Sequence, residues 1–328
     1  DRERYWDSGI EMIKADHLSK IYKVNTEKKQ NVLSSIFRPN RSEIYGVKDI
    51  SFEIQDGEKV GYIGLNGAGK STTIKLLTGI LKPSEGQLSV CGCIPHKERK
   101  MLAKKMGVVF GQRNQLWWDL PLMDSFALIK GIYSISDSDY HAKFEELSEV
   151  LALREMMNVP VRQLSLGQRM RGNLMAALLH NPQVLFLDEP TLGLDIDSRQ
   201  NFVKFIQSLN RQKVTVFLTT HNMRDIEEVC DRIIILDKGR IIYDGRLEDI
   251  YSDDYGKYVI RVKIKNPYED RENKYLIDAE GWIEYQARNN EEKDRFINEI
   301  LQRYTIEDIS IYENNLEGYL LNHTGVKK

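Results

Sequence analysis

Short runs of consecutive apolar residues alternate with longer helical patterns from about residue 12 to residue 250. The runs are rich in Val, Ile, Leu and Phe, and they lack the strict alternation of a half-exposed strand. Continuous runs of this kind indicate strands buried on both faces, as in a parallel sheet covered by helices. We therefore predict an α/β fold with a largely parallel core sheet. The clearest runs are residues 59–65, 105–110, 183–189, 214–221 and 232–236.

Two other patterns extend this prediction. Residues 51–54 and 239–245 carry Gly/Asp turn chemistry and are expected to be antiparallel. The α/β pattern breaks near residues 251–257, and the remaining C-terminal residues are typical of a small α+β domain. We therefore predict one domain over residues 12–252 and a second over 253–328. The second is expected to contain strands at 257–266, 281–288 and 306–313 and an amphipathic helix at 290–304.

Residues 23–43 interrupt the first domain. This stretch has five Lys/Arg against two Glu, and Val32, Leu33, Ile36 and Phe37 recur at roughly helical spacing. One interpretation is a surface insertion. The other is a basic amphipathic segment that touches a membrane surface or a membrane partner.

Composition limits the possible classes of protein. The chain has 328 residues with a formal net charge of −2, so we expect no nucleic-acid binding through a global basic field. No apolar run reaches the roughly 20 residues of a membrane helix. Three cysteines, an odd number, favour reduced thiols in the cytoplasm rather than disulfides, and the pair Cys91/Cys93 has no matching second pair for a metal. Met12 is a plausible native start, so residues 1–11 are a tag remnant or a native extension.

The segment GLNGAGKST at residues 64–72 fits the pattern G-x-x-x-x-G-K-[ST]. It follows a predicted strand and precedes a predicted helix, the context that this phosphate-binding loop requires. Glycines let backbone N–H groups converge on phosphate oxygens, and the helix directs its positive end at the same anion. Lys70 is expected to reach the β- and γ-phosphates, and Ser71 to hold Mg²⁺.

A pair of carboxylates follows the apolar run at residues 184–187. Ligands in open α/β sheets bind at the carboxyl ends of the strands, which is where this run delivers Asp188 and Glu189. Asp188 is expected to act on Mg²⁺ through water, and Glu189 to orient and polarise the attacking water.

The segment LSLGQ at residues 164–168 is by itself a serine-capped helix start. It precedes the carboxylates by 20 residues, TTH at 219–221 follows them, and VVFGQ ends at Gln112 between the phosphate loop and LSLGQ. This ordered set resembles the ATP-binding-cassette (ABC) ATPases over about residues 12–250. The resemblance implies a P-loop NTPase nucleotide-binding domain with a RecA-like core, an antiparallel β subdomain and a helical signature subdomain.

In that family two cassettes face each other head to tail and sandwich two ATP molecules. The resemblance makes Glu189, His221 and Gln112 catalytic, with Gln112 also sensing Mg²⁺ and the membrane partner, and Asp195 part of the D-loop across the dimer. Leu166 departs from the commonest signature, LSGGQ, but leaves the residues expected to serve the other chain's ATP intact. The resemblance implies nucleotide binding by Gly64, Asn66, Gly67, Ala68, Gly69, Lys70, Ser71, Thr72, Ser165, Gly167, Gln168 and Asp195. It implies metal binding by Ser71, Gln112 and Asp188.

Aromatic residues complete the resemblance. An aromatic side chain usually stacks on adenine upstream of the phosphate loop; Tyr22 fits that position, and Tyr45 is its rival. Trp117 and Trp118 follow Gln112, where the family's cassettes receive a coupling helix from the membrane subunit. Since neighbours on an extended segment alternate in direction, one tryptophan is expected in the core and one at the interface.

Longer segments, such as residues 66–81 and 164–195, resemble the ATPases of ABC-2-type exporters, and residues 108–121 resemble a viologen-exporter-like branch. The resemblance implies an ATPase peripheral to the cytoplasmic face of the membrane, working with separate permease subunits and a second ATPase subunit, which is identical or different. Alternatives are an ATPase of a polysaccharide exporter, because insertions before the phosphate loop occur there, and a soluble ABC ATPase without a transport role. A single phosphate loop and the short spacing from Lys70 to Leu164 speak against the soluble classes.

Overall fold

The structure is a computed structural model that describes residues 11–25, 41–111, 113–209, 213–250, 258–265, 275–278 and 280–313. The chain forms two compact units, Asp1–Asp244 and Gly245–Lys328. The domain boundary predicted between residues 252 and 253 lies outside the described residues, as do residues 1–10 and most of the 23–43 insertion. Its helical spacing at Val32, Leu33, Ile36 and Phe37 also falls there.

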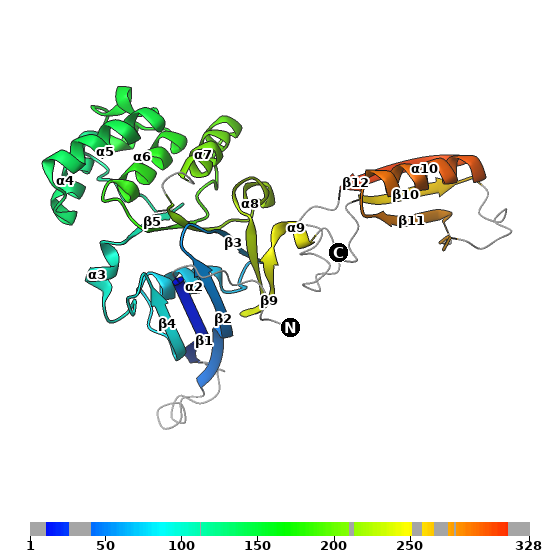
Figure 1. The fold of residues 1–328 in the computed structure, drawn as a ribbon, viewed down its shortest axis with the longest axis horizontal. Coiled ribbons are helices and arrows are strands. Elements are labelled where there is room, and N and C mark those ends of the chain that lie inside the picture. The colour runs from blue at the N-terminus through cyan, green and yellow to red at the C-terminus, as the bar shows by residue number, and fades with distance from the viewer. Residues whose placement is uncertain are drawn as a thin grey trace, which may run out of the picture. The chain divides into compact units, whose positions relative to one another are not determined.

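A six-stranded sheet forms the centre of the first unit, with the strand order β5-β6-β7-β3-β8-β9. Figure 1 labels β5, β3 and β9 of this sheet. The first five strands are parallel, which confirms the predicted sheet. Every residue of β3 and β7 is buried, because helices and the second sheet cover both faces. The last pair, β8 and β9, is joined by Lys238-Gly239, both at positive φ, a turn that favours a two-residue hairpin. The strands are β5 (Met106–Phe110), β6 (Val184–Asp188), β7 (Thr215–Thr219), β3 (Lys59–Gly64), β8 (Arg232–Asp237) and β9 (Arg240–Arg246).

A separate antiparallel sheet has the order β2-β1-β4, which confirms the prediction for residues 51–54, whereas residues 240–246 lie in β9 at the edge of the core sheet. Its strands are β1 (Glu11–Asn25), β2 (Arg41–Gln55) and β4 (Glu85–Val90). The ends of the 23–43 insertion lie in this sheet, since Lys23 pairs with Glu43. Aromatic packing joins the two sheets: the ring centroid of Phe52 in β2 is 6.0 Å from that of Tyr62 in β3 and 6.4 Å from that of Phe217 in β7.

Helices connect the strands of the first unit (Figure 1). The Tyr62 hydroxyl lies 2.9 Å from that of Thr73, which ties α2 to β3. A group of three longer helices, α4, α5 and α6, follows β5 in the chain and precedes β6. The helices of this unit are α2 (Lys70–Leu77), α3 (Arg99–Ala103), α4 (Leu122–Tyr133), α5 (Asp137–Val150), α6 (Leu166–Leu178), α7 (Ile196–Ser208) and α8 (Met223–Val229).

The second unit begins with the end of β9 and α9 (Leu247–Ile250) and contains a sheet in the order β11-β10-β12 with α10 against it. Along β10 the residues alternate between buried and half-buried, as expected for a sheet with one covered face. The covered face packs Ile260 and Val262 with Phe296 and Ile300 of the helix. The elements are β10 (Tyr258–Ile264), β11 (Trp282–Ala287), α10 (Asn290–Arg303) and β12 (Ile306–Glu313).

No described helix combines the length and the apolar character that crossing a bilayer requires.

Candidate functional site

The phosphate loop lies between β3 and α2, at the carboxyl edge of the core sheet. Gly69 precedes α2 at φ 115°, and a Cβ there would lie 2.3 Å from the backbone oxygen of Gly46, so only glycine fits. Gly67 also has a positive φ, in open space. Among the described residues no side chain caps α2, so its first N–H groups are left to an anion. Asn66 and Ser71 are exposed, Gly64 and Ala68 are buried, and Thr72 is half-buried.

Lys70 lies inside this loop with 7% of its surface exposed. Its Nζ donates to the backbone oxygens of Gly64, at 2.7 Å, and Leu65, at 3.3 Å. Burial lowers the pKa of Lys70, while the negative charges of Glu189 and Asp188 act in the opposite direction. The amine is therefore held by the loop on the side where the two carboxylates lie.

Two neighbouring strand ends position the first carboxylate. Asp188 ends β6, directly opposite Thr219 at the end of β7. The Thr219 hydroxyl donates to Oδ1 of Asp188 at 2.7 Å, which fixes the carboxylate and leaves its other lone pairs to accept. The sequence pattern marks this threonine only as part of TTH and gives no sign that it orients Asp188.

Glu189 has φ 53°, an unfavourable backbone conformation for a non-glycine residue and one common at functional sites. Its N–H donates to the Thr219 oxygen at 2.9 Å, and its Oε2 accepts from the His221 N–H at 3.1 Å. Oε1 is buried 3.0 Å from Nε2 of His221, but among the described residues no group donates a hydrogen bond to it. A buried carboxylate oxygen without a donor can accept a hydrogen bond from an attacking water.

The environment shifts the proton affinities of both groups. Burial raises the pKa of Glu189, and the His221 N–H and Lys70 oppose this. Burial lowers the pKa of His221, and Lys70 adds to the effect. Both shifts favour the uncharged forms of the two side chains, so they weaken an ion pair between Glu189 and His221.

These shifts predict a pH-dependent stability effect for Glu189→Gln in the nucleotide-free chain. Because the folded-state pKa of Glu189 lies above its ordinary value, ionisation of the carboxylate costs stability as pH rises through that pKa. Glutamine removes this cost, so we expect the variant to melt at a higher temperature than wild type at pH 7.5 and at nearly the same temperature at pH 4.5. Thermal melts at the two pH values measure it. An equal shift at both would contradict a raised Glu189 pKa.

Gln112 lies outside the described residues, so its catalytic and metal-binding roles stay predictions. The backbone N–H of its neighbour Gly111 donates to the backbone oxygen of Asp188 at 2.7 Å. A Cβ on Gly111 would lie 1.9 Å from the backbone oxygen of Glu189. The chain thus approaches Gln112 in backbone contact with the two carboxylate residues.

The signature segment begins α6. The Ser165 hydroxyl accepts from the Gln168 N–H at 3.2 Å, and the Gln168 side chain accepts from the Ser165 N–H at 2.8 Å. This reciprocal pair is a capping box. Leu166 remains 38% exposed, and a Cβ added to Gly193 would lie 3.1 Å from its Cδ2.

The start of α7 lies against this signature turn. Asp195 caps α7, accepting from the Ser198 N–H and hydroxyl, both at 2.8 Å, and these bonds lower its pKa. A Cβ on Gly167 would lie 2.2 Å from the Ser198 hydroxyl oxygen. The predicted site residues thus form two groups, one around Lys70 and one around Asp195. Within the described part of the chain no hydrogen bond or ion pair joins the two groups.

The two candidate adenine-stacking tyrosines differ in their neighbours. Tyr22 pairs with Ile44, so it faces the opposite side of the sheet from Tyr45, which pairs with Ile21. The Tyr22 hydroxyl lies 3.4 Å from that of Thr72, beside the phosphate loop, and 37% of the residue is exposed. Tyr45 instead packs under the Lys48 amine, 4.7 Å from its ring centre. These positions favour Tyr22.

Both tryptophans after Gln112 are exposed, Trp117 at 39% and Trp118 at 48%. The expectation that one of them lies in the core is therefore wrong. The segment turns sharply here, since the Trp117 oxygen accepts from the Leu120 N–H, so the alternation of an extended strand does not apply. The Arg169 guanidinium lies 5.2 Å from the Trp118 ring centre, which connects this surface to the signature helix.

The chemistry of these donors fits Mg²⁺, which prefers oxygen ligands and takes one or two carboxylates together with substrate phosphates. Ser71 offers an exposed hydroxyl on the first turn of α2, and Asp188 offers carboxylate oxygens. The described residues hold no group of three or more His, Cys, Asp or Glu placed to bind a metal without such phosphates.

Comparison with known proteins agrees with this geometry. The sequence model of the family described as "ABC transporter" matches residues 47–192. The chain is 33% identical over 218 residues to the ABC transporter ATP-binding protein NatA of Bacillus subtilis, covering 66% of this chain and 89% of that protein. It is 34% identical over 227 residues to the linearmycin resistance ATP-binding protein LnrL of the same organism, covering 68% of this chain and 73% of that one.

Among solved structures, one similar chain is a dimeric ATP-binding cassette in a post-hydrolysis state bound to ADP and Pi. The TM-score is 0.60 at 26% identity, over 72% of this chain and 99% of that one.

Proposed function

The chain belongs to the ATP-binding proteins of the ABC transporter family, and from that premise we propose that it drives export through separate membrane subunits of the ABC-2 type. It is an ATPase subunit of a transporter, and such cassettes work as dimers. The resistance function in the name of LnrL supports the exporter type.

The proposed mechanism rests on the separation of the site residues into two groups. Lys70, Asp188, Glu189 and His221 gather at one edge of the core sheet, and Ser165 and Asp195 gather at the starts of α6 and α7. Each group has part of what ATP hydrolysis needs. A second chain, turned head to tail, supplies the part that each lacks.

In this arrangement the phosphate loop holds the nucleotide and Lys70 neutralises its β- and γ-phosphates. Mg²⁺, when bound, neutralises charge on the phosphates, and Ser71 and Asp188 are the residues that would hold it, together with Gln112. Glu189 accepts a hydrogen bond from the attacking water through Oε1. His221 lies beside Glu189, and its ring donates a hydrogen bond to the γ-phosphate. The start of α6 directs its positive end, with Ser165, at the γ-phosphate of the ATP held by the other chain.

Closure of the two chains on ATP and their reopening after hydrolysis would rock the membrane subunits. The exposed Trp117 and Trp118 are the proposed contact for these subunits, at the cytoplasmic face of the membrane. A homodimer is sufficient, because the phosphate-loop, carboxylate, signature and histidine motifs are all complete in one chain.

Co-expression with a six-helix membrane protein encoded beside the gene tests the exporter assignment. We expect the two proteins to purify together from membranes in detergent and to hydrolyse ATP, and the double variant Trp117→Ala/Trp118→Ala to lose the membrane protein while still binding ATP. Tyr312→Ala, an exposed aromatic of the second unit, serves as the control. Recovery of an active cassette that never associates with the membrane protein would contradict the assignment.

A further inference from the structure

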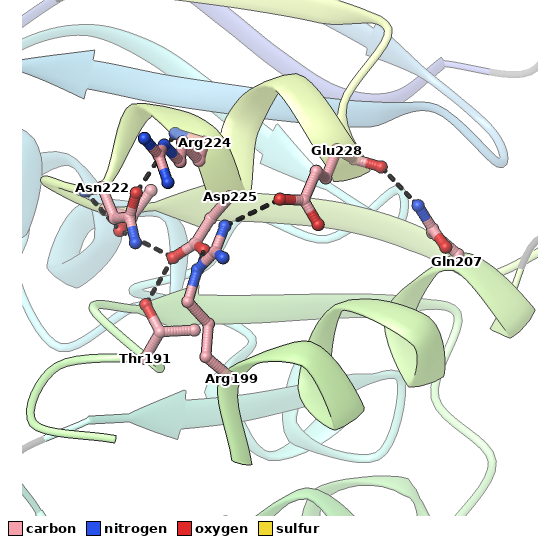
Figure 2. A network of polar contacts seen from close by, with 8 residues as sticks. Thr191, Arg199, Gln207, Asn222, Arg224, Asp225 and Glu228 are labelled. Atoms are coloured by element: carbon pink, nitrogen blue, oxygen red, sulfur yellow. Dashed lines mark hydrogen bonds and ion pairs between the residues drawn. The ribbon is translucent and has the colours of Figure 1, made fainter. Parts of the chain in front are cut away.

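A fully buried carboxylate lies behind the site, on the helix that follows His221. Asp225 of α8 has no exposed surface, and its side chain accepts hydrogen bonds from three others. Figure 2 labels two of these donors, Thr191 and Arg199. Oδ2 accepts from the Thr191 hydroxyl in a short hydrogen bond and more weakly from the Thr220 hydroxyl at 3.4 Å. Oδ1 accepts from Nε of Arg199 in an ion pair.

The three donors come from the two segments that the site must align. Thr191 lies two residues after Glu189, at the start of the stretch that leads to Asp195. Arg199 lies in the first turns of α7, the helix that Asp195 caps. Thr220 directly precedes His221, and its hydroxyl also accepts from the Asn222 N–H at 3.0 Å, so it fixes the backbone on both sides of the histidine.

Further contacts hold α7 and α8 together along their lengths. Nη2 of Arg199 lies 2.9 Å from Oε1 of Glu228 at the end of α8. The Gln207 side chain, near the end of α7, donates to the Glu228 backbone oxygen at 2.7 Å (Figure 2). The buried Lys59 amine donates to the Ile206 oxygen at 2.8 Å, which ties the end of α7 to β3.

Burial makes this attachment rigid. A charge in a low-dielectric interior is tolerated only while its partners stay in place, and sliding α7 past α8 would leave Asp225 unpaired. The two helices should therefore move together, and with them Asp195 and His221.

We propose that Asp225 is a positioning residue that couples the placement of Asp195 by the second chain to the placement of His221 at the reacting phosphate. The inference rests on the proposed function, because it requires two cassettes that close on ATP. Its consequence is cooperativity: engagement of one interface sets the histidine of the same chain, so turnover rises more steeply than the first power of ATP concentration.

The full chain carrying Asp225→Asn tests this. Asparagine keeps the shape but removes the charge that holds Arg199. We expect an ATP dissociation constant close to wild type, a turnover number lower by roughly 10²-fold, as for a misplaced catalytic group, and a Hill coefficient that falls toward 1. A Hill coefficient and turnover equal to wild type would overturn the proposal. A wild type without cooperative turnover would overturn the proposed function, and the inference with it.

Arg232→Gln is the matched control. The Arg232 side chain is more buried than that of Arg199, with 11% against 17% exposed, and it bridges Glu58 and Asp244 at the opposite end of the core sheet. The Arg232→Gln variant should have a lower melting temperature than wild type and an unchanged Hill coefficient. A similar loss of cooperativity in this variant would mean that any weakened ion pair has the effect, and would also overturn the role of Asp225.

A second pair of variants covers the case in which Asp225→Asn does not fold. Thr191→Val removes one donor with little change in volume, whereas Thr191→Ser retains the hydroxyl. We expect Thr191→Val to lower turnover and cooperativity, and Thr191→Ser to restore both. Equal behaviour of the two variants would overturn the proposal.

Discussion

Replacing Glu189 by Gln is expected to lower ATP turnover by roughly 10²–10⁴-fold, the usual contribution of a general base, while ATP still binds. The amide keeps the size of the side chain and can still accept from the His221 N–H. It cannot take a proton from water. With hydrolysis blocked, two chains should stay closed on Mg-ATP, so light scattering should detect a particle of twice the 38.2 kDa monomer.

Glu53→Gln provides the control, since it removes a carboxylate of β2 that pairs with Lys14 on the antiparallel sheet, away from the phosphate loop. That variant should hydrolyse ATP at the wild-type rate and should not accumulate as a dimer. If Glu189→Gln stayed monomeric at saturating Mg-ATP, the head-to-tail sandwich would be refuted. Turnover near the wild-type rate would remove Glu189 from the catalytic role.

Replacing Lys70 by Ala is expected to abolish stabilisation by ATP. A ligand at about 100 times its dissociation constant stabilises the folded state by roughly 2.7 kcal/mol, and without the ammonium group the loop no longer neutralises the phosphates. The measurement is the difference in melting temperature with and without Mg-ATP, because losing the Lys70 hydrogen bonds to Gly64 and Leu65 also changes the nucleotide-free protein.

Lys59→Ala is a matched control for that measurement. Lys59 is as buried as Lys70 and also donates its amine to backbone oxygens, but at the far end of β3. It should lower the melting temperature of the nucleotide-free chain and keep the shift caused by ATP. An ATP-induced shift of wild-type size in Lys70→Ala would show that the phosphate loop is misassigned.

The parts of the site that sequence could predict are those in which neighbouring residues act together. The loop at residues 64–72 is recognisable because glycine and lysine must stand at fixed spacing for backbone N–H groups to surround a phosphate. The cap at Ser165 follows the same rule, since Gln168 is three residues away. The core strands were predictable because burial on both faces leaves mostly apolar residues in the run.

The remaining features depend on burial and on contacts between distant segments. Asp225 looks like an ordinary charged helix residue until folding buries it against Thr191 and Arg199. Gly111 gave no signal, because the Glu189 backbone that excludes a side chain there is 78 residues away. Position in the sequence favours Tyr22 over Tyr45, but only the pairing of β1 and β2 shows that the two lie on opposite faces. The tryptophans were mispredicted because a turn stands where an extended segment was assumed.

The capping box at the start of α6 places different demands on Ser165 and on Leu166. A hydroxyl has a proton to give as well as lone pairs to accept with. In Ser165 the cap uses a lone pair, so the proton stays free for a phosphate oxygen, and helix and nucleotide do not compete for the side chain. Aspartate would cap the helix equally well but would present a negative charge where a phosphate must bind. Leu166 meets no such double demand, because its side chain needs only to lie over Gly193. We therefore expect residue 166 to tolerate substitution, whereas residue 165 should need a hydroxyl group.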